Sequence, residues 1–170
     1  MDVRIKIKAT VTDLTLAEKY NNSLKDGFFV SESGERLPYE RLASECEDVI
    51  EYTAIGSYVE NGDRVSIAYT EPEDIGLDCV TTLVFDKSDR SVLTMVRSGE
   101  LNAAFRFDMN EKRQLCSYET PFMPVEFIAN TRNIENNVSE KGGTMLLDYC
   151  LEVRGVNTER NRMLIEVRPL

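Results

Sequence analysis

The sequence predicts an all-β protein, a closed antiparallel up-and-down (calycin/lipocalin-like) barrel of about 8–10 strands with a long, partly helical excursion after the first strand. Three observations predict this fold. Apolar and polar residues alternate with period two along most of the chain. Gly, Asn, Asp and Ser interrupt the alternation at short intervals, and the connections between the runs are short enough for hairpins. Closing the sheet would also protect its edges.

The first strand is expected over residues 3–11, because Val3, Ile5 and Ile7 face one way while charged residues face the other. The excursion follows at 12–46. It contains a possible helical turn capped by Thr12 or Asp13, and a possible short helix that starts at Pro38. A connection this long is usually functional or disordered.

The alternation then returns in a series of short segments. Asn61-Gly62 predicts a tight hairpin, and Gly155-Val156-Asn157 opens the last one. The polar stretch 133–140 is expected to leave the sheet, with one possible helical turn. The strands are expected at 49–59, 64–70, 77–85, 91–97, 102–109, 114–120, 125–132, 144–154 and 162–167.

Four segments carry a resemblance to a known family. They are residues 51–58 (EYTAIGSY), 96–102 (VRSGELN), 117–122 (SYETPF) and 140–149 (EKGGTMLLDY). In this order they resemble the YwiB-like family of small bacterial calycin-type β-barrels, a domain of unknown function, over residues 1–11 and 47–170. The resemblance implies a lipocalin-like barrel with no established activity.

Composition limits the function classes. A chain of 170 residues fits one domain, 1–170, with a core that needs no metal or disulfide. The net charge of −10 and the lack of a basic run in the sequence argue against nucleic acid and anionic membranes as partners. The first residues alternate rather than form an apolar run, so we expect a cytoplasmic protein. The four cysteines form no metal-binding motif and are expected to be buried.

The chain contains no histidine. This removes the ordinary general base near neutral pH, His-ligated metals and the Ser-His and Cys-His mechanisms. The sequence predicts no catalytic residue, no metal and no cofactor, and an enzyme is the least favoured class. It would need carboxylate, Tyr or Lys catalysis.

The candidate ligand-binding residues are Arg97, Tyr118, Thr120 and Tyr149. Arg97 ends an apolar strand face, where its guanidinium could hold an anion. The alternative is a structural arginine that closes one barrel end by stacking on an aromatic ring. Tyr118, Thr120 and Tyr149 lie on strand faces where a hydroxyl could line a pocket mouth, although a buried tyrosine often only satisfies a backbone carbonyl.

Two functions therefore remain open besides the enzyme. The first is a non-catalytic barrel that binds a small, largely apolar or anionic ligand. The second is a structural or protein-interaction domain that acts through its surface, with a homodimer as one form; the excursion 12–46 motivates it.

Overall fold

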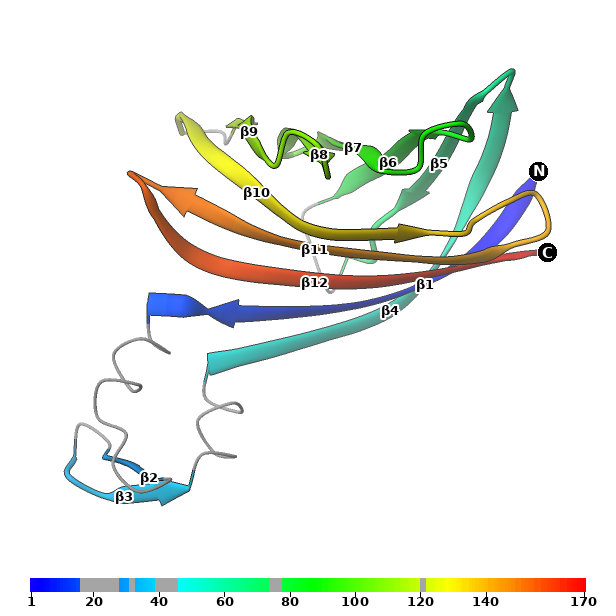
Figure 1. Ribbon diagram of the computed structural model, residues 1–170. Helices are drawn as coiled ribbons and strands as arrows, with labels where there is room; N and C mark the ends of the chain where they lie inside the picture. Colours follow the sequence, from blue (N-terminus) through cyan, green and yellow to red (C-terminus); the bar gives the residue numbers. More distant parts are fainter. Residues whose placement is uncertain (16–27, 31–32, 39–45, 74–77, 120–121) are drawn as a thin grey trace.

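The computed structural model spans residues 1–170 and describes all of them except 16–27, 31–32, 39–45, 74–77 and 120–121. Within the described residues, ten strands form one closed barrel (Figure 1). The first half of the chain contributes β1 (Asp2–Asp13), β4 (Glu47–Asn61), β5 (Arg64–Thr70), β6 (Cys79–Asp86) and β7 (Val92–Gly99). The second half contributes β8 (Asn102–Asp108), β9 (Arg113–Glu119), β10 (Pro124–Asn136), β11 (Gly143–Val153) and β12 (Val156–Pro169).

The strand order is that of a meander. From β4 to β12 each strand pairs antiparallel with the next one in the sequence. β1 closes the ring, because it pairs with β4 on one side and with β12 on the other. The predicted closed antiparallel barrel is therefore confirmed. Among the residues described, no helical stretch has the length and hydropathy that a membrane crossing requires.

The partly helical excursion is not supported. Thr12 and Asp13, the expected helix caps, belong to β1. Thr12 pairs with both β4 and β12, and Asp13 pairs with β12. Helical conformation in the described part of 12–46 is limited to residues 14–15 and 46. The segment instead holds a separate two-stranded sheet, β2 (Phe28–Val30) and β3 (Arg36–Pro38), so Pro38 ends a strand. The rest of the two expected helical stretches lies outside the described residues.

Two strand boundaries also differ from the prediction. The stretch after residue 132 stays in the sheet, since β10 continues to Asn136 after a bulge that shifts the register between Thr131 and Asn133. A bulge lets a strand absorb an extra residue and bend without leaving the ladder. The last hairpin turns at Arg154 and Gly155, both with positive φ (52° and 82°), so β12 begins at Val156 rather than at 162. This pair of angles is typical of a two-residue hairpin loop.

The barrel has a terminal end, where both chain termini lie, and an opposite end (Figure 1). The terminal end also carries the connections 62–63, 87–91, 109–112 and 137–142. This half is filled by large side chains that are fully or almost fully buried. They include Val3, Ile5, Val65, Ile67, Leu83, Leu93, Phe107, Met145 and Ile165. The four cysteines are buried as well, as the sequence predicts.

An arginine spans the terminal end. The guanidinium of Arg90, in the β6–β7 connection, lies 5.4 Å from the ring centroid of Phe85. Its Nη1 donates hydrogen bonds to the carbonyl oxygens of Val138 (2.7 Å) and Asn136 (3.4 Å) in the β10–β11 region. This single side chain therefore ties together connections that are far apart in the sequence.

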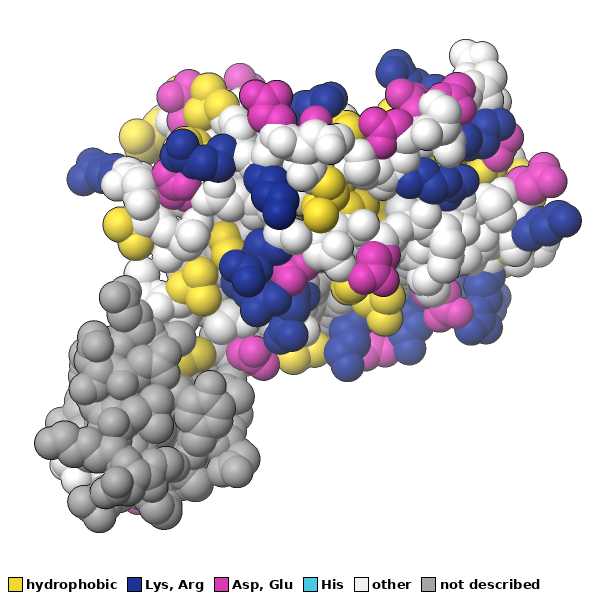
Figure 2. Space-filling view, in the orientation of Figure 1, with side chains coloured by type: hydrophobic (Ala, Val, Ile, Leu, Met, Phe, Trp, Pro, Cys, Tyr) yellow, Lys and Arg dark blue, Asp and Glu magenta, His cyan; other side chains and the backbone are white. Residues whose placement is uncertain are grey.

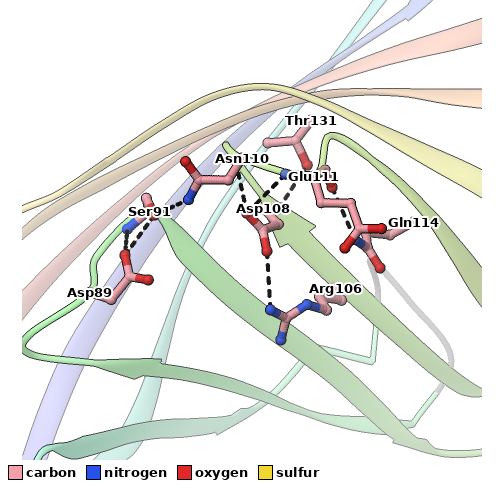
Figure 3. A network of polar contacts seen from close by, with 8 residues as sticks. All are labelled: Asp89, Ser91, Arg106, Asp108, Asn110, Glu111, Gln114 and Thr131. Carbon is pink, nitrogen blue, oxygen red and sulfur yellow. Dashed lines mark hydrogen bonds and ion pairs between the residues drawn. The ribbon is translucent and has the colours of Figure 1, made fainter.

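A carboxylate organises the neighbouring β8–β9 turn (Figure 3). Asp108 accepts hydrogen bonds from the main-chain N–H groups of Asn110 (2.8 Å) and Glu111 (3.2 Å) and from Nη2 of Arg106 (3.1 Å). Its own N–H donates to the Thr131 hydroxyl on β10 at 3.1 Å. The bond from the Asn110 N–H holds the pKa of Asp108 below its ordinary value, although burial acts in the opposite direction. The turn is thus fixed by polar contacts at the terminal end.

Candidate functional site

The opposite half of the barrel contains a pocket. A pocket of about 270 Å³ lies between the inward faces of β1, β4, β5, β6, β7, β11 and β12. It occurs where β1, β5 and β7 finish and where β4, β6 and β12 begin, which is the end that faces away from the chain termini. The pocket wall consists of Ile7, Ala9, Val11, Ile50, Tyr52, Tyr69, Glu71, Thr81, Met95, Arg97, Tyr149, Asn161 and Met163.

Strand pairing brings the polar part of this wall together. Tyr69 pairs with Thr81, and Thr81 pairs with Arg97, so the three side chains form one inward row across β5, β6 and β7. The face opposite this row is apolar and comes mainly from β1 and β12. A small molecule in the pocket would therefore meet an apolar surface and a short row of polar groups, as in most ligand pockets.

The charged group of the row is a buried ion pair. Nη2 of Arg97 lies 2.5 Å from Oε2 of Glu71, and the Thr81 hydroxyl donates to Oε1 of Glu71 at 2.7 Å. The Glu71 side chain is 9% exposed and that of Arg97 is 25% exposed. Both carboxylate oxygens of Glu71 are thus bonded inside the protein, and its charge is balanced.

One donor of Arg97 remains unused. Its Nε–H is buried and has no hydrogen-bond partner among the described residues. Burial alone would lower the pKa of Arg97, but the charge and the hydrogen bond of Glu71 outweigh it, so the pKa is raised and the guanidinium stays charged. A buried donor without an acceptor is costly.

The pocket tyrosines keep their protons at neutral pH. Burial raises the pKa of Tyr52, of Tyr69 and of Tyr149. The rings of Tyr52 and Tyr69 lie with centroids 6.5 Å apart, and Tyr149 packs against Phe107 at 4.6 Å. These side chains supply apolar ring surface together with neutral hydroxyl groups. They add hydrogen-bonding capacity to the pocket but no charge.

The predicted site residues do not all meet. Arg97 and Tyr149 both line the pocket. Tyr118 is partly buried beside it and does not line it; its ring packs edge-on against Phe127 with centroids 6.1 Å apart. Thr120 lies outside the described residues. Whether any of the four binds a ligand remains a prediction.

The alternative prediction for Arg97, stacking on an aromatic ring, is not supported within the described residues. Arg97 pairs with Glu71, and within the described part of the chain the arginine found over an aromatic ring is Arg90, at the terminal end. The sequence reasoning also missed Glu71, Thr81, Tyr52 and Asn161, which line the pocket. The alternation of the sheet could have found Glu71, since it continues the inward series of Val65, Ile67 and Tyr69 beyond the end of β5.

A second feature lies on the outer surface. Lys and Arg side chains gather over β1 and β12, along the lower side of the barrel in Figure 2. Pairing between β1 and β12 brings together basic residues that are far apart in the sequence. The folded protein therefore has a basic strip on its surface although the sequence contains no basic run. We call this set the outer basic strip: Arg4, Lys6, Lys8, Arg160, Arg162 and Arg168.

Most of the outer basic strip is ion-paired. Lys6 contacts Glu51 at 2.7 Å, Arg160 contacts Asp148 at 2.6 Å, Arg162 contacts Glu47 at 3.2 Å, and Arg168 contacts Glu166. The pairs of Lys6 with Glu51 and of Arg162 with Glu47 are exposed or half-exposed and contribute little to stability, whereas the Asp148 side chain is only 12% exposed. Arg4 and Lys8 have no salt-bridge partner among the described residues.

Comparison with known proteins agrees with the fold. Residues 40–165 match the family described as "Domain of unknown function (DUF1934)". The chain is 28% identical to the "Uncharacterized beta-barrel protein YwiB" of Bacillus subtilis (strain 168). The alignment spans 119 residues, which are 70% of this chain and 80% of that protein. The crystal structure of the ywiB protein from Bacillus subtilis superposes with a TM-score of 0.67, at 17% identity, over 99% of this chain and 92% of the other. The predicted resemblance to the YwiB-like family of β-barrels is confirmed, whereas the calycin-type or lipocalin-like classification stays a prediction.

Proposed function

The chain belongs to the family described as "Domain of unknown function (DUF1934)", which brings no activity with it, and we propose that the protein binds one small, largely apolar molecule in the barrel. One observation carries the proposal. The terminal half of the barrel is filled by its own side chains, whereas the other half keeps a pocket of about 270 Å³ with an apolar wall and a polar row. A barrel of this size can hold one small ligand in such a cavity.

The shape of the pocket limits the ligand. Its volume of about 270 Å³ lies just below the usual range for ligand sites, about 300–1,000 Å³, and favours a small ligand. Ile7, Ile50 and Met163 favour an apolar body. The polar row of Tyr69, Thr81 and Arg97 favours a polar group at one end of the ligand. The groups of the pocket bind and orient, because the tyrosines and the arginine hold their protons near neutral pH.

A neutral fluorescent probe tests the proposal. N-phenyl-1-naphthylamine brightens when it enters an apolar site, so titration with the intact protein should give a saturable curve with one site. Ala9→Trp fills the pocket, because Ala9 lies in its wall, and should weaken binding by at least about tenfold. Ala9→Phe is a milder second variant. Ala104→Trp is the matched control, since Ala104 lies exposed on β8.

The outcomes separate cleanly. Saturable binding that is lost in a folded Ala9 variant and kept in Ala104→Trp supports the pocket. No saturable binding to the native protein, or equal affinity in all three variants, overturns the proposal. Circular dichroism shows whether each variant is folded.

The second candidate function is interaction through the surface, and the outer basic strip favours it. The chain has a net charge of −10, so the strip of one copy could meet an acidic face of a second copy. Arg4 and Lys8 form no salt bridge with a described residue, although Lys8 lies opposite Glu51 in the β1–β4 pairing. Both are exposed on the outer face of β1 and are available for such a contact. The resulting homodimer would be sensitive to salt.

Sedimentation velocity tests this candidate at about 0.01 M and about 1 M salt, where the screening length falls from about 30 Å to about 3 Å. We expect a dimer at low salt that dissociates at high salt, and that is lost in Arg4→Ser/Lys8→Ser. The control is Arg64→Ser, an exposed arginine on β5. A monomer under both conditions refutes self-association.

From its sequence we also infer a cytoplasmic location.

A further inference from the structure

The charge balance of the pocket selects among the ligands that the proposed function allows. Within the described residues of the pocket wall, Glu71 and Arg97 are the charged side chains, and they are bound to each other. The site therefore has one cation, one anion and no net charge. A ligand entering it meets a neutralised arginine rather than a free one.

The hydrogen-bonding groups of the polar row indicate which kind of ligand the pocket favours. Each oxygen of Glu71 already accepts a hydrogen bond, Oε1 from Thr81 and Oε2 from Arg97. The guanidinium and the tyrosine hydroxyl groups of the pocket wall are hydrogen-bond donors. The polar row therefore favours a ligand oxygen that accepts a hydrogen bond. It offers no second positive charge.

A carboxylate ligand would supply that oxygen at a cost. The guanidinium that it must approach already holds the Glu71 carboxylate at 2.5 Å, so two anions would share one cation in a partly buried site. Like charges brought together during desolvation disfavour binding strongly. An amide, ketone or ester oxygen accepts a hydrogen bond from the same polar row and brings no charge.

We propose, on the basis of the binding function above, that Glu71 is a specificity determinant that makes the pocket select uncharged ligands with an oxygen acceptor over the corresponding carboxylates. Glu71 acts through Arg97, whose positive charge it cancels, and through Thr81, which holds its other oxygen in place. Removal of the Glu71 charge should convert the same pocket into an anion site. The sequence leaves both an apolar and an anionic ligand open, and this inference favours the uncharged class.

Two probes of almost the same shape test this inference. 2-Naphthamide and 2-naphthoate share the ring and the acceptor oxygen and differ in charge. Calorimetric or fluorescence titration of the native protein should show the amide bound at least about tenfold more tightly. In Glu71→Gln the order should reverse, with the carboxylate preferred by a similar factor, since Gln keeps the size of the side chain but not its charge.

Matched variants make the result specific. Glu166→Gln removes a carboxylate that is paired with an arginine, Arg168, on the outside of the barrel, and should keep the native preference. The double variant Glu71→Gln/Arg97→Gln should lose the gain in carboxylate binding, because that gain depends on the arginine.

The failure of this inference differs from failure of the binding function. If N-phenyl-1-naphthylamine binds the pocket but the native protein does not discriminate between the two naphthyl probes, Glu71 is no specificity determinant. The same conclusion follows if Glu71→Gln remains folded, binds N-phenyl-1-naphthylamine and keeps the native order. If none of the three probes binds the native protein, the binding function itself is wrong.

Discussion

Replacement of Arg90 by alanine should destabilise the barrel more than removal of any exposed arginine. Arg90 is the side chain that connects the β6–β7 connection to the β10–β11 region across the terminal end. Its guanidinium lies over Phe85 at 5.4 Å and donates to the Val138 carbonyl at 2.7 Å. Arg90→Ala removes both contacts and leaves the carbonyl without its charged donor.

The magnitude follows from these contacts. A partly shielded cation–π contact contributes about 0.5–2 kcal/mol. A hydrogen bond from a charged donor contributes about 1.5–3 kcal/mol. Because the two contacts share one side chain and are not additive, we expect a loss of about 2–4 kcal/mol in the free energy of unfolding. For a chain of this size, that loss lowers the melting temperature by about 5–15 °C.

Urea denaturation followed by circular dichroism measures the effect, with the midpoint and the slope fitted separately. The control is Arg64→Ala, because Arg64 is 68% exposed and its contact with Asp86 is long, at 3.4 Å. We expect less than about 0.5 kcal/mol for this control. Equal midpoints for the Arg90 and Arg64 variants would refute the idea that Arg90 holds the terminal end together.

Three other predictions concern the strands and turns. Asp108→Asn should be less stable than the native protein at neutral pH, and the difference should shrink as pH falls below the unfolded pKa of about 3.9. The reason is that a lowered folded-state pKa gives stability that is present above the unfolded value and is lost as pH falls through the folded value. Denaturation at several pH values measures the difference, and a constant difference would contradict it. Gly56→Ala should cost about 1–3 kcal/mol in thermal unfolding, because its Cβ would lie 2.3 Å from the Ala68 carbonyl oxygen; an unchanged melting temperature would show that β4 yields there. Arg154→Gly should raise the melting temperature by about 2–4 °C, because Arg154 has a φ of 52° that glycine adopts more easily; a lower temperature would show that the arginine side chain stabilises the hairpin.

The sequence predicted the barrel well because its main determinant is local. Period-two alternation places Val65, Ile67 and Tyr69 on the inner face whatever the neighbouring strands are, and short turns leave antiparallel pairing as the simple connection. Where the prediction failed, tertiary structure overrode local polarity. The polar stretch after 132 stays in β10 because β11 is there to pair with it, and a bulge absorbs the mismatch.

The site was predicted only in part, because a site depends on which strand ends meet. Arg97 and Tyr149 could be nominated from their strand faces, and both line the pocket. Neither face reveals that Glu71 reaches Arg97, 26 positions away, or that Arg90 takes the stacking role first considered for Arg97. Polar residues at the end of a strand look like ordinary turn residues until the register is known.

The two arginines show how the ends of one barrel come to differ. Arg90 lies over a ring and donates from Nη1 to carbonyl groups, so it closes the terminal end around a packed core. Arg97 is held by a carboxylate at one nitrogen and left unsatisfied at another, beside a cavity that no described side chain fills. Packing accounts for the first arrangement completely. Packing does not account for the pocket beside the second arginine, where a neutralised ion pair and a row of polar side chains border open space. This combination is the strongest physical reason to look for a ligand at this end of the barrel.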